Sequence, residues 1–309
     1  MDGGEAAWFA GDRPANRIRD GRADAPADWP ALAVETGFAA EEADYEAALH
    51  EATTTAAREA VRERERADDA QLIHAVRAMD DTRRVANELA ERVAEWGGSL
   101  FAIDDASSEG SGASASDADG ALADARRIAR RDPETAVERR VVSLAERAAA
   151  TADEAEELAR YVERVAPRTA PNLAALAGPT LAARLIALAG GLESLAKRPS
   201  GTVQVLGAEE ALFAHLRGHA PSPKHGVIFT HPYVRETRPE DRGSAARALA
   251  GKLAIAARVD HYAGDRRPEL DRELDERIAR IRARAEDDAS GTSASEAGAS
   301  GTSDGEGDE

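Results

Sequence analysis

The sequence contains no cysteine, only two methionines and few aromatic residues, which make up 4% of its 309 residues. Without cysteine, disulfides and thiolate metal sites are excluded. Alanine dominates the apolar 42% of the chain, which favours helices that meet through small side chains. No apolar run approaches the roughly 20 residues of a membrane-spanning helix, and the acidic start MDGGEAAWFAGD lacks the apolar segment of a signal peptide. We therefore expect a soluble, cytoplasmic protein.

Lysine is also scarce. Only Lys197, Lys224 and Lys252 occur among 40 basic residues, against 58 acidic ones, which gives a net charge of −18. Many carboxylates, few lysines and abundant alanine indicate adaptation to a very salty cytoplasm, such as that of a halophilic archaeon. At 1 M salt the Debye length is about 3 Å, so that acidic self-repulsion is screened. The net charge therefore says little about partners.

One segment runs against this acidic background. Between Gly178 and Tyr262, eleven Lys and Arg stand against seven Asp and Glu, a local charge of +4, and five of the seven histidines fall there. A local excess of this kind indicates an anion-binding face. Chance clustering within an ordinary domain explains the same numbers.

The first half of the chain predicts a small module followed by a helical arm. Residues 1–36 are rich in Gly, Pro, Asp and Arg, with only Trp8, Phe9 and Trp29 as large anchors. A helical pattern runs from 41 to 96, and residues 104–120 have the composition of a disordered loop. From Val137 to Val165, small and apolar residues then recur at alternating steps of four and three, which is typical of a coiled coil. The two patterns predict an antiparallel hairpin that ends at Pro167 and Pro171.

The second half predicts a compact helical domain. Helices are expected at 179–188, 207–217, 244–262 and 267–286, followed by a disordered acidic tail. The predicted fold class is mainly α: a small N-terminal module, a long antiparallel helical coiled-coil arm and a compact all-helical domain. The expected boundaries are 1–60 for the module, 61–166 for the arm with its loop at 104–120, 167–286 for the domain and 287–309 for the tail.

Catalytic motifs are weak. Ser194 and Lys197 fit the S-x-x-K pattern of a serine acyl enzyme, but its S-D-N and K-T-G partners are missing. His215 and His219 have a spacing that binds zinc on a helix, without a third ligand in support. We expect neither an enzyme nor a cofactor or metal, and a hydrolase built on Ser194 is kept as a rival hypothesis.

A better candidate is the helix that follows Gly207-Ala208, because a glycine turn before a helix N-terminus is a place where phosphate can bind. Glu209 and Glu210 fall in its first turn, where they serve equally well as ordinary capping residues.

Three segments carry a resemblance to a known family: GPTLAARLIALAGGLESLAKRPSGTVQVLGAEEALFAHL, PSPKHGVIFTHPYV and RGSAARALAGKLAIAARVD. In this order they resemble the Nop domain of the archaeal and eukaryotic core proteins of box C/D ribonucleoproteins. The resemblance covers roughly residues 39–285, because DDAQLIHAVRAMDD, NELAERVAEW and APNLAALAGP are similar to the family's coiled-coil arm and its entry to the Nop domain.

The resemblance implies a scaffold rather than an enzyme. Members of the family bind a guide RNA together with a kink-turn-binding protein of ribosomal type. They present fibrillarin, the methyltransferase of ribose 2′-hydroxyls, on their N-terminal domain, and they self-associate through the arm. The implied function is assembly of a guide-RNA complex that methylates ribosomal RNA, with transfer RNA as a further target. The rival from another class is a structural coiled-coil dimer without any RNA.

The family motif GAEK–ALFR reads here GAEE and ALFA, so that Glu210 and Ala214 replace its two basic residues, and Thr230 stands where relatives often have His. The N-terminal module is also shorter than the family's α/β domain. The residues expected to bind RNA or its bound protein are Lys197, Arg198, Gln204, Gly207, Ala208, Glu209, Lys224, His225, His231, Arg242, Arg247 and Lys252. The arm residues expected to mediate dimerisation are Val137, Val141, Leu144, Ala148, Leu158 and Val162.

Overall fold

A computed structural model of the chain describes residues 7–10, 14–20, 27–101 and 117–297. Within these ranges the ordered elements are helices and no strand occurs, so the mainly-α fold class is confirmed. The chain divides into two compact units, Met1–Ala70 and Gln71–Glu309. The two units are described separately below.

The first unit is built on helices α1 (Pro14–Asp20), α2 (Trp29–Glu35) and α3 (Glu42–Glu65). Aromatic side chains supply its core. Phe9 stacks on Phe38 with ring centroids 4.8 Å apart, and Trp8 donates a hydrogen bond from Nε1 to Tyr45 Oη over 3.2 Å. The three predicted anchors, Trp8, Phe9 and Trp29, therefore belong to one cluster.

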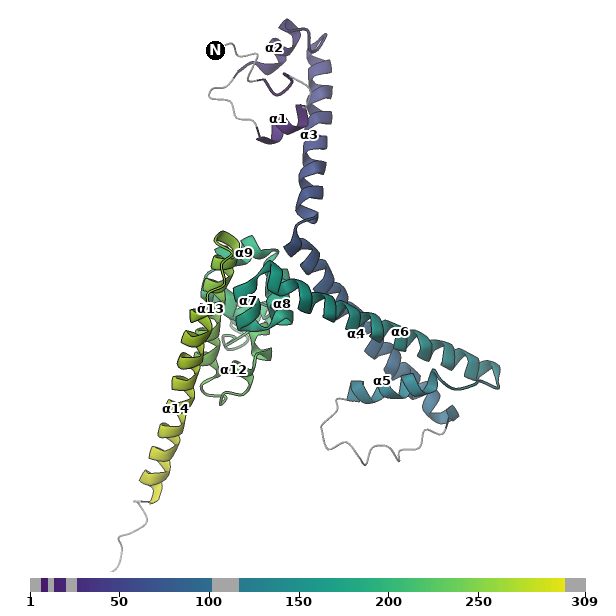
Figure 1. Cartoon of the computed structure of the whole chain (residues 1–309), viewed down its shortest axis with the longest axis vertical. Helices are drawn as coiled ribbons and strands as arrows, with labels where there is room; N and C mark the ends of the chain where they lie inside the picture. The colour runs from purple at the N-terminus through teal and green to yellow at the C-terminus, as the bar shows by residue number, and fades with distance from the viewer. Residues whose placement is uncertain (1–6, 11–13, 21–26, 102–116, 298–309) are drawn as a thin grey trace, which may run out of the picture. The chain divides into compact units, whose positions relative to one another are not determined.

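The arm consists of α4 (Asp68–Phe101), α5 (Asp117–Ile128) and α6 (Ala136–Thr169). One buried cluster joins the late part of α4 to the early part of α6, and a second joins the early part of α4 to the late part of α6. The two long helices are therefore antiparallel, as Figure 1 shows. A capping box starts α6, because the Thr135 hydroxyl accepts from Glu138 N and the Glu138 carboxylate accepts from Thr135 N.

The predicted seam holds this hairpin together within one chain. Val141, Ala148 and Val162 are fully buried, and Leu144 and Leu158 pack against the same clusters. Only Val137 is exposed, by 47%. The expectation of a dimer contact is therefore corrected for Val141, Ala148 and Val162, because a second copy cannot reach side chains that have no exposed surface. For Val137, Leu144 and Leu158, which keep exposed surface, it stays a prediction.

Several helix ends differ from the prediction. The pattern at 41–96 is divided, because α3 ends at Glu65 and α4 begins at Asp68. Helix α5 includes residues 117–120 of the expected loop, and α14 (Glu269–Ala297) includes 287–297 of the expected tail; the rest of both segments lies outside the described residues. Pro167 lies inside α6, which ends at Thr169. Its C-cap Ala170 precedes Pro171 and has left the α conformation, which is disfavoured before a proline.

The compact domain follows the arm in the second unit. Its helices are α7 (Pro171–Ala177), α8 (Pro179–Ala189), α9 (Leu192–Lys197), α10 (Ser200–Val205), α11 (Glu209–Leu216), the 3-10 helix η2 (Val227–Thr230), α12 (Pro232–Arg235), α13 (Arg242–Tyr262) and α14.

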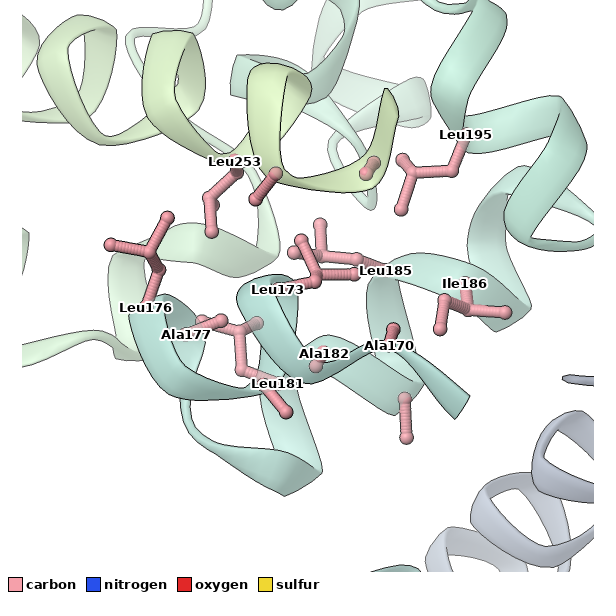
Figure 2. Close-up of a cluster of buried hydrophobic side chains, with 14 of the residues drawn as sticks. Ala170, Leu173, Leu176, Ala177, Leu181, Ala182, Leu185, Ile186, Leu195 and Leu253 are labelled. Carbon is pink, nitrogen blue, oxygen red and sulfur yellow. The ribbon is translucent and has the colours of Figure 1, made fainter. Parts of the chain in front are cut away.

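The long helix α13 is the centre of this domain. It is packed against α7, α9, α10, α12 and α14, and its buried face is almost entirely alanine and leucine. Figure 2 shows Leu173 and Leu185 below α13, between Leu253 on that helix and Leu195 of α9. Because alanine lets helices approach closely, this core fixes α13 as a rigid rod from which the site is built.

A buried carboxylate locks α7 onto the end of α13. Asp260, which is 8% exposed, accepts hydrogen bonds from Asn172 N over 2.9 Å, Leu173 N over 2.8 Å and Asn172 Nδ2 over 2.7 Å. Asn172 Oδ1 in turn accepts from Arg267 N over 2.6 Å. Asp260 thus serves as an N-cap supplied from another helix, because it satisfies free N–H groups at the start of α7.

Among the described residues, no single helix is both long and apolar enough to cross a bilayer. Taken together, α7 and α8 pass on length and composition, with a 117° bend between them.

Candidate nucleic-acid interface

The loop that carries Lys224 and His225 is held on the end of α10 by three hydrogen bonds. Gln204 Nε2 donates to Lys224 O over 2.7 Å, Gly226 N donates to Gln204 O over 2.8 Å, and Val227 N donates to Leu206 O over 2.7 Å. Gln204, expected to touch RNA, therefore acts by fixing the loop, since its amide is bound to the backbone of Lys224.

Two glycines make this close approach possible. A Cβ at Gly226 would lie 1.9 Å from Leu206 O, a distance that no side chain tolerates against backbone. Gly207 has φ +80°, and a Cβ there would lie 3.3 Å from Val227 Cβ. Both positions thus need glycine, one for space and one for its left-handed conformation.

Phe229 is the centre of the cationic cluster. The His225 ring stacks on it at 4.6 Å with an interplanar angle of 19°, and the guanidinium of Arg242 lies 5.4 Å from its centroid. Burial, together with the positive charges of Arg242 and Lys224, lowers the pKa of His225 below its usual value. His225, Lys224 and Arg242 are therefore electrostatically coupled. An anion bound among them would favour the protonated form of the His225 imidazole.

Arg242 is oriented by backbone at the start of α13. Its Nε donates to Thr237 O over 3.0 Å and its Nη2 to Arg235 O over 3.2 Å. The side chain of Lys224 passes this helix start, because a Cβ at Gly243 would lie 3.9 Å from Lys224 Cδ. Arg247 is exposed one turn further along α13. Among the described residues, neither Lys224 nor Arg247 has an ion-pair partner, so both charges are available to phosphate.

Lys197 and Arg198 are not brought to this cluster. Arg258 donates to Ala196 O and to Arg198 O, each over 3.1 Å, which fixes both residues near the far end of α13. At 1.5 Å per residue, Arg258 lies about 24 Å along the helix from Arg242. The Lys197 ammonium pairs with Glu193, which raises the pKa of Lys197, and not with Ser194 of the S-x-x-K pattern. Arg198 donates to Ala189 O over 3.2 Å and so caps α8.

His231 and Lys252 are used inside the domain. His231 accepts at Nδ1 from Tyr233 N over 3.2 Å, and its Nε2 lies 3.0 Å from Leu176 O. The expectation that His231 faces RNA is corrected, because no ring nitrogen is left for a ligand. Lys252 forms an ion pair with Glu273 of α14 and joins the two helices.

The start of α11 already contains an anion. The Glu209 carboxylate accepts from Gly207 N over 2.9 Å, and Ala208 is the N-cap residue without a side-chain cap. With Glu210 in the same turn, two carboxylates lie at this helix start, which favours the capping reading of Glu209 over a phosphate site. Helix α11 also has no buried residue, and its Phe213 and Leu216 are 58% and 70% exposed.

Sequence reasoning missed Phe229, the residue that organises the cluster. A signal was present, since Phe229 follows His225 by four residues in a short apolar run. An apolar run predicts a buried segment and hence a core position for Phe229. In the structure Phe229 is only partly buried.

Comparison with known proteins identifies a family that covers this segment. The family model described as Nop, snoRNA binding domain, fibrillarin, matches residues 104–283, more than half of the chain. An uncharacterised NOP5 family protein of Methanocaldococcus jannaschii is 49% identical over 142 residues, which are 46% of this chain and 34% of the relative. Nucleolar protein 58 of Debaryomyces hansenii is 42% identical over 126 residues, 41% of this chain and 24% of the relative.

The matched segment thus spans about a third or less of these relatives. A crystal structure of a fibrillarin/Nop5p complex is similar at 22% identity with a TM-score of 0.49, over 90% of this chain and 99% of that one. The family match alone covers more than half of the sequence, and it includes the loop, Phe229 and α13. The chain therefore belongs to the Nop family, whose model describes a snoRNA-binding domain.

Proposed function

We propose that the chain is a scaffold subunit of a box C/D guide-RNA ribonucleoprotein and has no catalytic chemistry of its own. It binds the guide RNA with its kink-turn-binding protein and positions fibrillarin for ribose 2′-O-methylation of ribosomal RNA, with transfer RNA as a second target class. The observation that carries the proposal is the convergence of Lys224, His225 and Arg242 around Phe229 in a chain of net charge −18.

We place this function in a concentrated-salt cytoplasm, where phosphate attraction alone is weak because affinity falls steeply with salt concentration. Stacking and hydrogen bonding are screened much less than long-range charge. A cluster built on Phe229, with Arg242 fixed by two carbonyls, suits these conditions. It also suits a chain in which Glu210 and Ala214 replace the basic residues of the family motif.

The kink-turn-binding protein docks on α11 in this proposal. An eight-residue helix without a buried residue, which exposes Phe213 and Leu216, has apolar surface to offer a partner. Because Glu209 and Glu210 make the start of this helix acidic, a protein surface fits there better than an RNA phosphate does.

Self-association uses the exposed residues of the arm rather than the buried residues of its seam. Trp96 and Leu100 of α4 are 43% and 42% exposed, and Val137 lies near the facing end of α6. We expect light scattering in multimolar KCl to give a dimer mass, and Trp96→Glu to give a monomer. A monomer mass for the unmodified chain would refute this part of the proposal.

Fibrillarin docks on the first unit. This unit has a groove of about 580 Å³ between its aromatic cluster and α3, lined by Trp8, Phe38 and Ala52. Such a groove can receive an apolar side chain of a partner. In a pull-down with fibrillarin in concentrated salt, Ala52→Glu should abolish capture if the groove is the docking site, and unchanged capture would contradict it.

The main test is a charge change at the cluster. Lys224→Glu with His225→Ala should weaken capture of a preformed complex of kink-turn RNA and its protein about tenfold in multimolar KCl, because one phosphate contact is lost and another is repelled. Arg140→Glu is the matched control, since Arg140 is an exposed arginine of the arm far along the chain from the cluster.

Circular dichroism should show the same helicity for the three proteins. Equal capture by the double variant and the unmodified chain would show that the cluster does not bind RNA. The rival hypothesis, a structural coiled-coil protein without RNA, would then be favoured. A loss in the control of the same size would mean that the effect follows net charge and not position.

A further inference from the structure

A cavity of about 660 Å³ lies beside the cationic cluster and has no part in the function proposed so far. It is formed by α4, α8, Gly207 and the segment 226–230, all within the second unit. Its volume falls in the range of sites that bind small molecules. Gly207 and Phe229 line it, so that the cavity and the cluster share residues.

One wall of the cavity is polar and rigid. Arg184 Nε donates to Asp80 Oδ2 over 3.0 Å and Arg184 Nη2 to Asp80 Oδ1, a paired geometry that fixes both groups. Arg77 lies on the same wall and donates from Nη2 to Ala187 O over 3.3 Å. A guanidinium has five N–H donors, so these contacts leave donors beside carboxylate acceptors. A fixed set of donors and acceptors is what the edge of a nucleobase requires.

Apolar side chains make up much of the remaining lining. Leu188, which is 43% exposed, and Val227 line the cavity with Phe229. Gly207 approaches this apolar part closely, since even a Cβ there would lie 3.4 Å from Leu188 Cδ1. The Phe229 ring that lines the cavity also contacts the cationic residues. Its centroid lies 4.6 Å from that of the His225 ring and 5.4 Å from the guanidinium carbon of Arg242. A ligand with a flat apolar body and an adjoining negative charge fits both features together.

We propose that this cavity takes one unpaired base of the guide RNA, turned out of its stack, while the phosphate beside it is held by Lys224 and Arg242. The inference rests on the proposed function and adds a site to it. A paired base does not fit, because its edge is used by its partner and its faces by its neighbours. Single-stranded bases, in contrast, are free to stack on aromatic side chains and to bind through their edges.

The test combines a filled cavity with a series of RNAs. Leu188→Trp fills the cavity from a partly exposed position, and Ile255→Trp is its matched control, because Ile255 is 40% exposed on α13 and does not line the cavity. The RNAs are kink-turn RNAs, preloaded with their protein, in which each unpaired nucleotide is made abasic in turn. Capture by the full chain is measured in multimolar KCl.

For the unmodified chain and Ile255→Trp we expect one abasic position to weaken capture about tenfold, the size of one stacking contact. Leu188→Trp should bind the intact RNA about tenfold more weakly and show no further loss at that position. If Leu188→Trp does not fold by circular dichroism, Arg77→Ala serves instead, with a severalfold smaller discrimination expected at the same position.

Other outcomes overturn the inference. If Leu188→Trp weakens capture but no abasic position does so for the unmodified chain, the cavity receives part of the kink-turn protein instead of a base. If Leu188→Trp binds like Ile255→Trp, the cavity is not used. If the unmodified chain captures none of the RNAs, the proposed function itself fails, which the intact RNA alone reveals.

Discussion

Replacement of Gly226 by alanine tests the link between the loop and the cluster. The new Cβ would lie 1.9 Å from Leu206 O and 2.7 Å from Leu206 C, and both are backbone atoms that cannot rotate away. The loop therefore has to move off α10. Lys224 and His225 would move with it, because they directly precede Gly226 and are held by the same contacts.

The cost can be estimated from the contacts that would be lost. Movement of the loop breaks the hydrogen bonds from Gly226 N to Gln204 O and from Val227 N to Leu206 O, which contribute about 1 kcal/mol each. Overpacking adds about 1–3 kcal/mol. We expect the free energy of unfolding to fall by roughly 3–5 kcal/mol, which for a unit of this size lowers Tm by about 10 °C.

Thermal unfolding followed by circular dichroism in multimolar KCl measures this loss. Gly251→Ala is the matched control, because Gly251 lies inside α13 and a Cβ there meets nothing within 4 Å. Helix propensity should make this control more stable, by about 1 kcal/mol. A Tm for Gly226→Ala within about 2 °C of the unmodified chain would show that the loop does not pack on α10, and the position of Lys224 would then have no structural basis.

Three further predictions concern polar and charged side chains that stabilise the second unit. Burial lowers the pKa of His231, so the fold keeps this imidazole neutral while the unfolded chain takes up a proton near pH 6.5. The free energy of unfolding should therefore fall as the pH drops below about 6.5. Chemical unfolding at a series of pH values should show a weaker dependence of this free energy on pH for His231→Asn, which keeps an N-cap acceptor. Asp260→Ala leaves three N–H groups at the start of α7 without their acceptor and should cost about 3 kcal/mol in thermal unfolding, and a cost below about 1 kcal/mol would contradict the N-cap role. Arg126→Ala should cost less than about 1 kcal/mol in the same assay, because the ion pairs of Arg126 with Asp153 and Glu156 are exposed.

The compact domain was the most predictable part of the fold. Glycine and proline mark the ends of its helices in the sequence. Gly178-Pro179 starts α8, and Gly190 ends it in a left-handed conformation. The helix expected at 244–262 is α13, Arg242–Tyr262. The arm's hairpin also followed from its heptads, but the presence of α5 did not. The segment before α5 has a disordered composition, and only contact with α6 makes Ala125 and Ile128 a buried face.

The site was less predictable, because charge in the sequence does not say what a charge contacts. Lys224 and Lys252 look alike along the chain, yet Lys252 is neutralised by Glu273 of α14, 21 residues away, whereas Lys224 is not paired among the described residues. His225 and His231 differ in the same way. Only tertiary packing places Leu176 O against His231 and so removes that histidine from the surface.

The scarcity of lysine has a structural counterpart in how the arginines of this domain are used. Arg198 donates to a carbonyl at the end of α8, Arg258 to two carbonyls at the end of α9, and Arg242 to two carbonyls before α13. A guanidinium reaches two acceptors at once with a planar fork, which a lysine ammonium does not. Arginines bound in this way cap helix ends and depend little on salt, because their partners are backbone carbonyls rather than carboxylates. Because Arg198 and Arg258 are used in this way away from the cluster, the local charge of +4 overstates the surface open to RNA. An Arg242→Lys exchange should weaken RNA capture even though the charge is kept, because the single ammonium cannot hold both carbonyls and stay over Phe229.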